Sequence, residues 1–195
     1  MQIPLLPYLI AVNILAFAVT VHDLLCDRKV RPMLPTPIWV VLVCAGGGPG
    51  ILAAFPVAHG HIYKRTVFRL FAAIISTILW TLGTLTTAGL IHFDVDSLTE
   101  ALRAPHPVLA AYLVAVNLVT LLCFIVDKHQ ARRHLSRIPE AVLLGLSLAG
   151  GATGGLLGMC LAHHKTAKPY FRWGLPLCLI TDLVVLAYLL QAGLI

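Results

Sequence analysis

Ala45-Gly46-Gly47-Gly48-Pro49-Gly50 interrupts an apolar run over residues 38–58, and Ala149-Gly150-Gly151-Ala152-Thr153-Gly154 interrupts another over 141–162. Both runs are long enough to cross a bilayer, which takes about 20 apolar residues. Glycine clusters favour sharp turns. At membrane depth such irregular backbone is tolerated only where protein or a water-filled cavity covers it. We therefore predict that these two stretches are hinges, formed by Gly46, Gly47, Gly50, Gly150, Gly151 and Gly154.

The composition of the whole chain agrees with a membrane protein. Hydrophobic residues make up 59% of the 195 positions and charged residues 11%, whereas a soluble domain has about 25% charged residues. Four further apolar stretches are close to spanning length: 4–21, 70–91, 108–126 and 173–195. The first lacks the basic flank and cleavage site of a signal peptide, so it is predicted to be a retained helix. We expect an all-α integral membrane protein.

The two glycine stretches belong to an internal repeat. A shift of 104 residues aligns 8–64 with 112–168 without a gap, and 17 of the 57 aligned pairs are identical. The identities include Asn13 with Asn117 and Asp23 with Asp127. A repeat of this size in an apolar chain indicates internal pseudosymmetry. We predict two membrane units, a diverged copy over 1–91 and a second copy over 108–195, joined by an acidic linker over 92–107.

Two topologies are compatible with this pattern. If the glycine segments re-enter, the chain has four full crossings plus two re-entrant segments, and every Lys and Arg except Arg103 lies on one face. If they span, there are six crossings, the repeats are inverted, and the 14 basic residues divide equally between the faces. The positive-inside rule favours the first topology, with the basic loops in the cytoplasm. A glycine-rich spanning helix that packs closely on its neighbours remains the alternative.

The loops of the second unit contain a candidate anion-binding site. Pro139 and Pro169 each suggest a helix that begins there. Helix N-termini offer free N–H groups and a partial positive charge, which suit a phosphate or carboxylate together with nearby cations. The predicted anion-binding residues are Arg132, Arg133, Arg137, Lys165, Thr166, Lys168 and Arg172. The alternative is that these cations only anchor the loops to anionic lipid headgroups.

The same loops hold a candidate catalytic set: His163, His164, Asp127 and Glu140. Histidine titrates near neutral pH and a carboxylate can orient it, as general acid and base catalysis requires. The first unit has Gly60 and Thr36 opposite His164 and Glu140, so a catalytic site is expected in the second unit. The spacing of Cys160, His163 and His164 would also allow zinc binding, but a fourth ligand is lacking, and histidines in a loop at a membrane surface are the simpler interpretation. We expect no metal site and no cofactor.

Three polar residues fall inside apolar stretches. Asn13 and Asn117 occupy one position of the repeat, and Asp182 stands alone in the last apolar stretch. Asparagine at membrane depth commonly forms hydrogen bonds between helices, and we expect that role here. An intramembrane carboxylate suggests a functional site, although a protonated, hydrogen-bonded core residue is an equal alternative for Asp182.

The second unit resembles a known bacterial membrane family. The resemblance rests on Asp127-Lys128, Arg137-Ile138-Pro139-Glu140, Gly150-Gly151 with Gly154, and His164-Lys165-Thr166 with Lys168 and Phe171. This combination is similar to the family called domain of unknown function 1294. It covers residues 108 to about 193, and residues 5–90 look like a diverged second copy that lacks two of the motifs. The resemblance implies a bacterial inner-membrane location and assigns no activity.

Three functions remain open at this point. The leading hypothesis is a small transporter, channel or lipid-handling protein that binds an anionic, phosphate-bearing ligand at its basic face, because paired broken segments in two halves indicate a transport site. The second is a membrane enzyme acting on phospholipid headgroups. The third is a scaffold that recruits protein or nucleic acid, although the chain lacks the interleaved aromatic and basic residues that bind nucleic acid. We expect membrane lipids as partners, and a homo-oligomer remains open.

Overall fold

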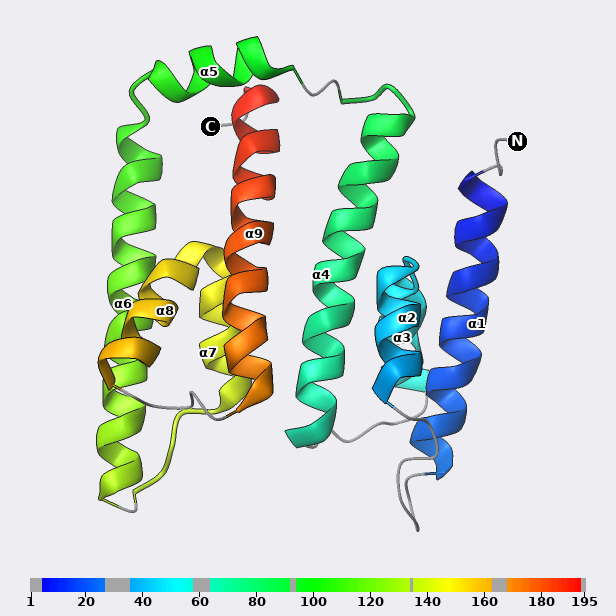
Figure 1. The fold of residues 1–195 in the computed structure, drawn as a ribbon, viewed down its shortest axis with the longest axis horizontal. Coiled ribbons are helices and arrows are strands. Elements are labelled where there is room, and N and C mark those ends of the chain that lie inside the picture. Colours follow the sequence, from blue (N-terminus) through cyan, green and yellow to red (C-terminus); the bar gives the residue numbers. More distant parts are fainter. Residues whose placement is uncertain are drawn as a thin grey trace. The chain divides into compact units, whose positions relative to one another are not determined.

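The computed structural model describes residues 5–26, 36–57, 64–91, 94–133, 135–162 and 168–193, which form helices joined by turns and short loops (Figure 1). The prediction of an all-helical chain is confirmed for these residues. The chain divides into two compact units, Met1–Thr84 and Leu85–Ile195. Among the described residues, five stretches are long and apolar enough to cross a membrane: Leu5–Leu25, Val67–Thr87, Pro107–Arg132, Glu140–Leu161 and Phe171–Gln191.

Unit 1 is built around a bent pair of short helices. Its helices are α1 (Leu5–Cys26), α2 (Thr36–Cys44), α3 (Gly48–Val57) and α4 (Lys64–Thr87), the last of which continues past the boundary of the unit. The break between α2 and α3 bends the chain by 118°, so that α3 returns towards the end of the unit where α2 began (Figure 1). Trp39, Leu42, Ile51 and Phe55 from the two short helices pack with Ala16 and Ala73 in the core.

Unit 2 repeats this order of elements and adds one helix. Its elements are α5 (Val95–Arg103), α6 (Pro107–Arg132), α7 (Glu140–Leu146), the π-helix η1 (Ser147–Gly151), α8 (Ala152–Ala162) and α9 (Pro169–Gln191). The backbone leaves helical geometry at Ala149 and Gly150, and Figure 1 shows the chain doubling back there between α7 and α8. Phe124 and Phe171 are fully buried, and their rings pack edge to face with centroids 5.7 Å apart.

The additional helix α5 lies across one end of unit 2 (Figure 1) and falls within the predicted acidic linker. Asp94 caps it, because its side chain accepts a hydrogen bond from the Ser97 backbone N–H at 2.9 Å. That hydrogen bond holds the pKa of Asp94 below its usual value. Gln191 near the end of α9 donates to the Asp94 carbonyl and to the Ser97 hydroxyl. The described part of the linker, residues 94–107, is therefore structured, and hydrogen bonds attach it to the last helix.

The long helices extend beyond the apolar stretches that predicted them. The sequence predicts 4–21 and 108–126, whereas α1 continues to Cys26 and α6 to Arg132. The added turns carry Asp23 in α1 and Asp127, Lys128 and His129 in α6. Hydropathy marks where a chain stops being apolar, but a helix ends only where its backbone bonding ends. Both helices therefore carry charged residues just beyond their apolar part.

Candidate functional site

In each unit, an asparagine from the preceding long helix holds the glycine turn. In unit 1, Asn13 Nδ2 donates to the Gly46 carbonyl at 3.1 Å, and Asn13 Oδ1 accepts from the Gly50 N–H at 2.8 Å. Gly46 has φ 94°, a conformation that side chains other than hydrogen rarely allow. One side chain therefore satisfies a backbone acceptor and a backbone donor that the break in the helix leaves without partners. We call this arrangement the asparagine clamp.

Unit 2 contains the same clamp. Asn117 Nδ2 donates to the Gly150 carbonyl at 3.0 Å, and Asn117 Oδ1 accepts from the Gly154 N–H at 2.6 Å. Gly150 has φ 98°, which repeats the turn conformation at Gly46. Each of these residues stands 104 positions after its counterpart in unit 1.

A tyrosine five residues before the asparagine supports each clamp. Tyr8 Oη donates to the Ala45 carbonyl at 3.1 Å, and Tyr112 Oη donates to the Ala149 carbonyl at 2.6 Å. These pairs are again separated by 104 residues. Two successive carbonyls at each bend therefore accept hydrogen bonds from side chains of α1 or of α6.

The backbone of each hairpin touches the backbone of the clamping helix. A Cβ at Gly50 would stand 2.2 Å from the Asn13 carbonyl oxygen, and a Cβ at Gly154 would stand 2.1 Å from that of Asn117. Real Cβ atoms essentially never approach other heavy atoms this closely. Only glycine fits these two positions, because the obstacle is a backbone atom of a long helix.

The two turns differ on their other side. In unit 1, Ser76 Oγ and Trp80 Nε1 from α4 donate to the carbonyls of the last two residues of α2, at 2.6 and 3.1 Å. Alignment of Phe68-Arg69 with Phe171-Arg172 places Leu179 and Leu183 at these positions in unit 2, and leucine has no donor. The turn of unit 1 is therefore bonded from both flanking helices, and that of unit 2 lacks these two donors.

Asp182 of α9 lies beside the turn of unit 2. Its carboxylate is near the backbone N–H groups of Gly150 and Ala152. Its Oδ2 is buried and has no hydrogen-bond partner among the described residues. The aligned residue in unit 1 is Leu79. An acidic group at the bend is thus a property of unit 2, and its functional role stays a prediction.

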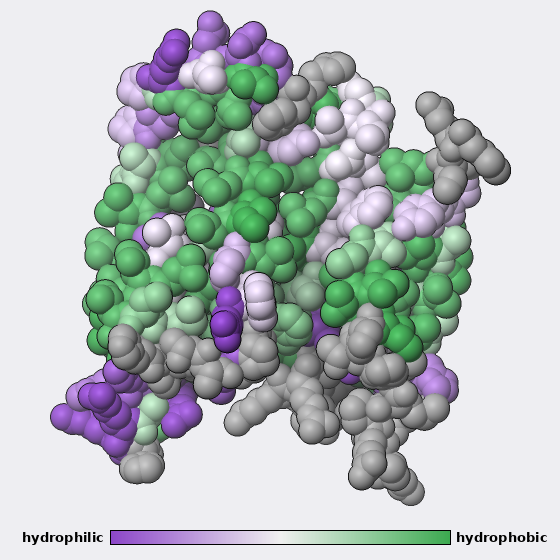
Figure 2. Space-filling model, in the orientation of Figure 1, coloured by the Kyte–Doolittle hydropathy of each residue, from purple (hydrophilic) through white to green (hydrophobic). Residues whose placement is uncertain are grey.

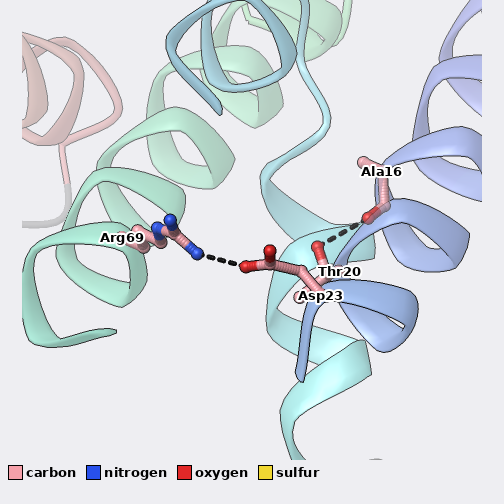
Figure 3. Close-up of polar contacts among 4 residues, drawn as sticks. All are labelled: Ala16, Thr20, Asp23 and Arg69. Carbon is pink, nitrogen blue, oxygen red and sulfur yellow. Dashed lines mark hydrogen bonds and ion pairs between the residues drawn. The ribbon is translucent and has the colours of Figure 1, made fainter. Parts of the chain in front are cut away.

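A buried ion pair joins α1 to α4 at the other end of the unit 1 hairpin. Arg69 bonds to the Asp23 carboxylate at 2.5 Å, and Asp23 is only 4% exposed (Figure 3). The Arg69 guanidinium also lies 4.3 Å from the centre of the Trp39 ring on α2. The hydroxyl of Thr20, one turn before Asp23, donates to the Ala16 carbonyl and does not bond to the Asp23 carboxylate. Arg69 of α4 therefore contacts both the other flanking helix, α1, and the first arm of the hairpin, α2.

Asp127, a candidate catalytic residue, is fully buried near the end of α6. Its Oδ1 accepts a hydrogen bond from the Ile138 backbone N–H at 3.1 Å. This bond fixes the loop between α6 and α7 to α6. The Asp127 carboxylate therefore has a structural role in holding this loop, and its catalytic role stays a prediction.

The predicted anion-binding residues that the structure describes lie at one end of unit 2. Lys168, the N-cap of α9, forms an ion pair with Glu140 in the first turn of α7. Arg132 and Arg133 end α6, Arg137 lies in the following loop, and Arg172 is in the first turn of α9. Arg133, Arg137 and Arg172 are exposed. Four candidate residues lie outside the described residues: His163, His164, Lys165 and Thr166.

Comparison with known proteins places unit 2 in a family. The family model named "Protein of unknown function (DUF1294)" matches residues 117–171. The uncharacterized protein YsdA of Bacillus subtilis is 38% identical over 80 residues, which cover 41% of this chain and 90% of YsdA. The chain belongs to the DUF1294 family. No solved structure matches the chain significantly.

The DUF1294 match covers the hairpin of unit 2 and the residues that hold it to α6 and α9. It begins at the clamp residue Asn117 and ends at Phe171, in the first turn of α9. Between them lie the glycine turn, Asp127 and the Glu140–Lys168 pair. Asp182 lies beyond the matched residues. The clamp and the glycine turn are therefore parts of the DUF1294 segment itself.

The ion pair outside the DUF1294 segment gives a first prediction. Arg69→Leu is expected to destabilise the protein by about 2 to 3 kcal/mol, because it leaves a buried carboxylate without its cation. The double variant Asp23→Asn/Arg69→Leu is expected to recover much of that loss. Unfolding of the purified protein by sodium dodecyl sulfate, followed by circular dichroism, measures both.

Arg172→Leu is the matched control for this prediction. Arg172 aligns with Arg69, but it is exposed and forms no ion pair with another described residue. We expect a change within about 0.5 kcal/mol, as for surface positions generally. Equal losses for Arg69→Leu and Arg172→Leu would contradict a special role for the buried pair.

Proposed function

We propose that the chain is a multi-pass membrane protein made of two copies of one unit, and that it acts as a small transporter, channel or lipid-handling protein for an anionic, phosphate-bearing ligand. Each copy comprises a spanning helix, a re-entrant hairpin and a second spanning helix. Its location would be a bacterial cytoplasmic membrane, with the basic loops in the cytoplasm. Helix length and apolar composition support membrane insertion.

The outer surface of the long helices also supports a lipid environment. Leu6 and Ile14 on α1, and Val108 and Val114 on α6, are each more than 60% exposed. Figure 2 shows hydrophobic residues along the helices and hydrophilic ones gathered at α5 and at the opposite end of α6. Extended apolar surface of this kind is rare on soluble monomers. In a bilayer, lipid chains would cover this surface, and its side chains would not be exposed to water.

The observation that carries the proposal is the occurrence of one clamp twice. The same asparagine, tyrosine and glycine contacts recur 104 residues apart. Paired broken segments in corresponding positions of two halves are the best pointer to a transport site in a membrane protein. The hairpins also satisfy the requirement that irregular backbone at membrane depth be covered by protein.

The ligand class follows from the charge at the basic end of unit 2. Arg132, Arg137 and Arg172 make no ion pair with another described residue. Arginine binds phosphate through two parallel hydrogen bonds. A phosphate group is therefore the ligand chemistry that these side chains fit best.

Cysteine accessibility tests the topology. Asp27→Cys, Ala58→Cys and Thr99→Cys are each labelled with a membrane-impermeant maleimide in intact cells and in inverted vesicles. A re-entrant hairpin places positions 27 and 58 on one face, and Thr99 on α5 on the other. If positions 27 and 58 label from opposite faces, the hairpin spans and the repeats are inverted.

Transport is tested in proteoliposomes with two probes, a fluorescent phosphatidylglycerol and radioactive inorganic phosphate. We expect one of them to cross faster than in protein-free vesicles, and Arg137→Gln/Arg172→Gln to slow it several-fold. Both substitutions remove exposed side chains, so folding should be preserved. A protein with the expected topology that moves neither probe would overturn the transport function and leave the architecture standing.

A further inference from the structure

A cleft lies where the last turns of α6 approach the end of α8. Its volume is about 320 Å³, and it is lined by Ile125, Lys128, His129, Arg132 and Leu161. Four of the five lining residues come from α6, at spacings of three, four and seven residues. These spacings place them along one face of the helix. Leu161, from the last turn of α8, forms the facing wall.

We propose that this cleft binds the phosphate of an anionic phospholipid, with the beginning of an acyl chain against Ile125 and Leu161. The proposal rests on the membrane location proposed above and names the ligand source. It also assigns a role to Lys128 and His129, which the sequence did not identify as binding residues.

The charge of the cleft selects an anion. Lys128 and Arg132 supply two cations, and the described residues that line the cleft include no Asp or Glu. Asp127, the acidic residue next to Lys128 in the chain, is fully buried and bonds to the Ile138 N–H instead. The side chains of His129 and Arg132 form no hydrogen bond or ion pair with another described residue. They are therefore available to donate to phosphate oxygens.

The order of residues along α6 matches the depth profile of a lipid. Arg132 stands at the end of the helix, and Ile125 lies seven residues earlier, about 10 Å along the axis. The headgroup region on each side of a bilayer is about 5 to 8 Å thick. Cations at the end of the helix would reach the phosphate while Ile125 contacts the chains. A lipid can contact both regions at once, with its phosphate at the cations and its acyl chain at Ile125.

The apolar walls distinguish a lipid from free phosphate. Ile125 is 44% exposed and Leu161 is 71% exposed. A free phosphate would leave both side chains uncovered, whereas an acyl chain would cover them and gain the free energy of their burial. The open cleft also lets the rest of a lipid extend along the exposed surface of α6. Both ligands would present a phosphate to the cations. The apolar walls favour the phosphate of a lipid over the free ion.

The test uses the full-length protein in phosphatidylcholine nanodiscs that contain phosphatidylglycerol with a photoreactive acyl chain. After irradiation, mass spectrometry maps the cross-linked peptides. We expect cross-links at Ile125 and Leu161 and their neighbours. Arg132→Gln is expected to reduce their yield about fivefold, which corresponds to one headgroup contact, and Lys128→Gln/Arg132→Gln about twentyfold.

Arg133→Gln is the matched control for the cleft alone: Arg133 belongs to the anion-binding set predicted from the sequence and carries the same charge at the next residue, but it does not line the cleft. We expect its cross-linking to stay close to that of the unchanged protein. Equal loss for Arg132→Gln and Arg133→Gln would show diffuse attraction to the headgroups and overturn the cleft. Displacement of the photoreactive lipid by inorganic phosphate would overturn the lipid as ligand and assign the cleft to the free ion.

The same experiment separates this inference from the proposed function. Photoreactive chains should label the exposed apolar faces of α1, α6 and α9 wherever the protein is embedded. Labelling of those helices without enrichment at the cleft would remove the lipid site and leave the membrane protein. Absence of acyl-chain labelling on every long helix would remove both.

Discussion

Asn117→Leu is expected to destabilise the protein by about 4 kcal/mol. The substitution keeps a side chain of similar size but removes the donor to the Gly150 carbonyl and the acceptor of the Gly154 N–H. Each buried backbone group without a partner costs about 1 to 3 kcal/mol. A typical interhelical hydrogen bond in a membrane contributes only about 0.6 kcal/mol. The larger figure is expected here because the bend leaves both backbone groups without a helical partner.

Unfolding by sodium dodecyl sulfate, followed by circular dichroism, measures this loss. Asn13→Leu should have a similar effect, because its bonds to Gly46 and Gly50 are the same. Leu118→Ala serves as the control, since Leu118 is the neighbour of Asn117 and is 53% exposed. A loss for Asn117→Leu no larger than that for Leu118→Ala would show that the clamp contributes little.

Gly154→Ala is expected to cost about 3 kcal/mol or to prevent folding of unit 2. The added Cβ would lie 2.1 Å from the Asn117 carbonyl oxygen. Backbone cannot move aside like a side chain, so α8 would have to shift away from α6 and break the clamp. Gly50→Ala should do the same in unit 1, where the corresponding distance is 2.2 Å.

Gly145→Ala provides a matched control for both glycine variants. Gly145 is in α7, and a Cβ there would meet no atom within 4 Å. Alanine favours a helix over glycine by about 0.8 to 1 kcal/mol, so a neutral or stabilising effect is expected. Thermal unfolding in detergent compares the variants, and expression level reports those that do not fold. Similar stability for Gly154→Ala and Gly145→Ala would contradict the close approach of α8 to α6.

The sequence predicted the positions of the bends but not what holds them. Glycine clusters within apolar runs indicate turns by composition alone. Asn13 and Asn117 were predicted to bond between helices, and the sequence did not identify the glycine turn as their target. A signal was present, because the separation from asparagine to the first turn glycine is 33 residues in both units. Equal separations in a repeat fit a contact, but they do not reveal one without the path of the chain.

Other parts of the site depend on tertiary packing that leaves no local pattern. Trp39 and Arg69 are 30 residues apart and meet only because α4 packs beside the hairpin arm α2. Ser76 and Trp80 look like ordinary residues of a spanning helix until the carbonyls they bond are known. The cleft at Lys128 and His129 likewise requires the end of α8 to reach α6. In contrast, the spacing of Val95, Leu98 and Leu102 could have indicated that the acidic linker contains an amphipathic helix.

The clamp also has a consequence for synthesis of the chain. In each unit the asparagine and the tyrosine belong to the long helix that precedes the hairpin in the chain, and the glycine turn follows 33 to 37 residues later. The acceptor and donor for the turn are therefore already in place when the hairpin emerges. In the membrane topology proposed above, each hairpin would dock as it is made, so its broken backbone would not be left exposed to lipid until a later helix is synthesised.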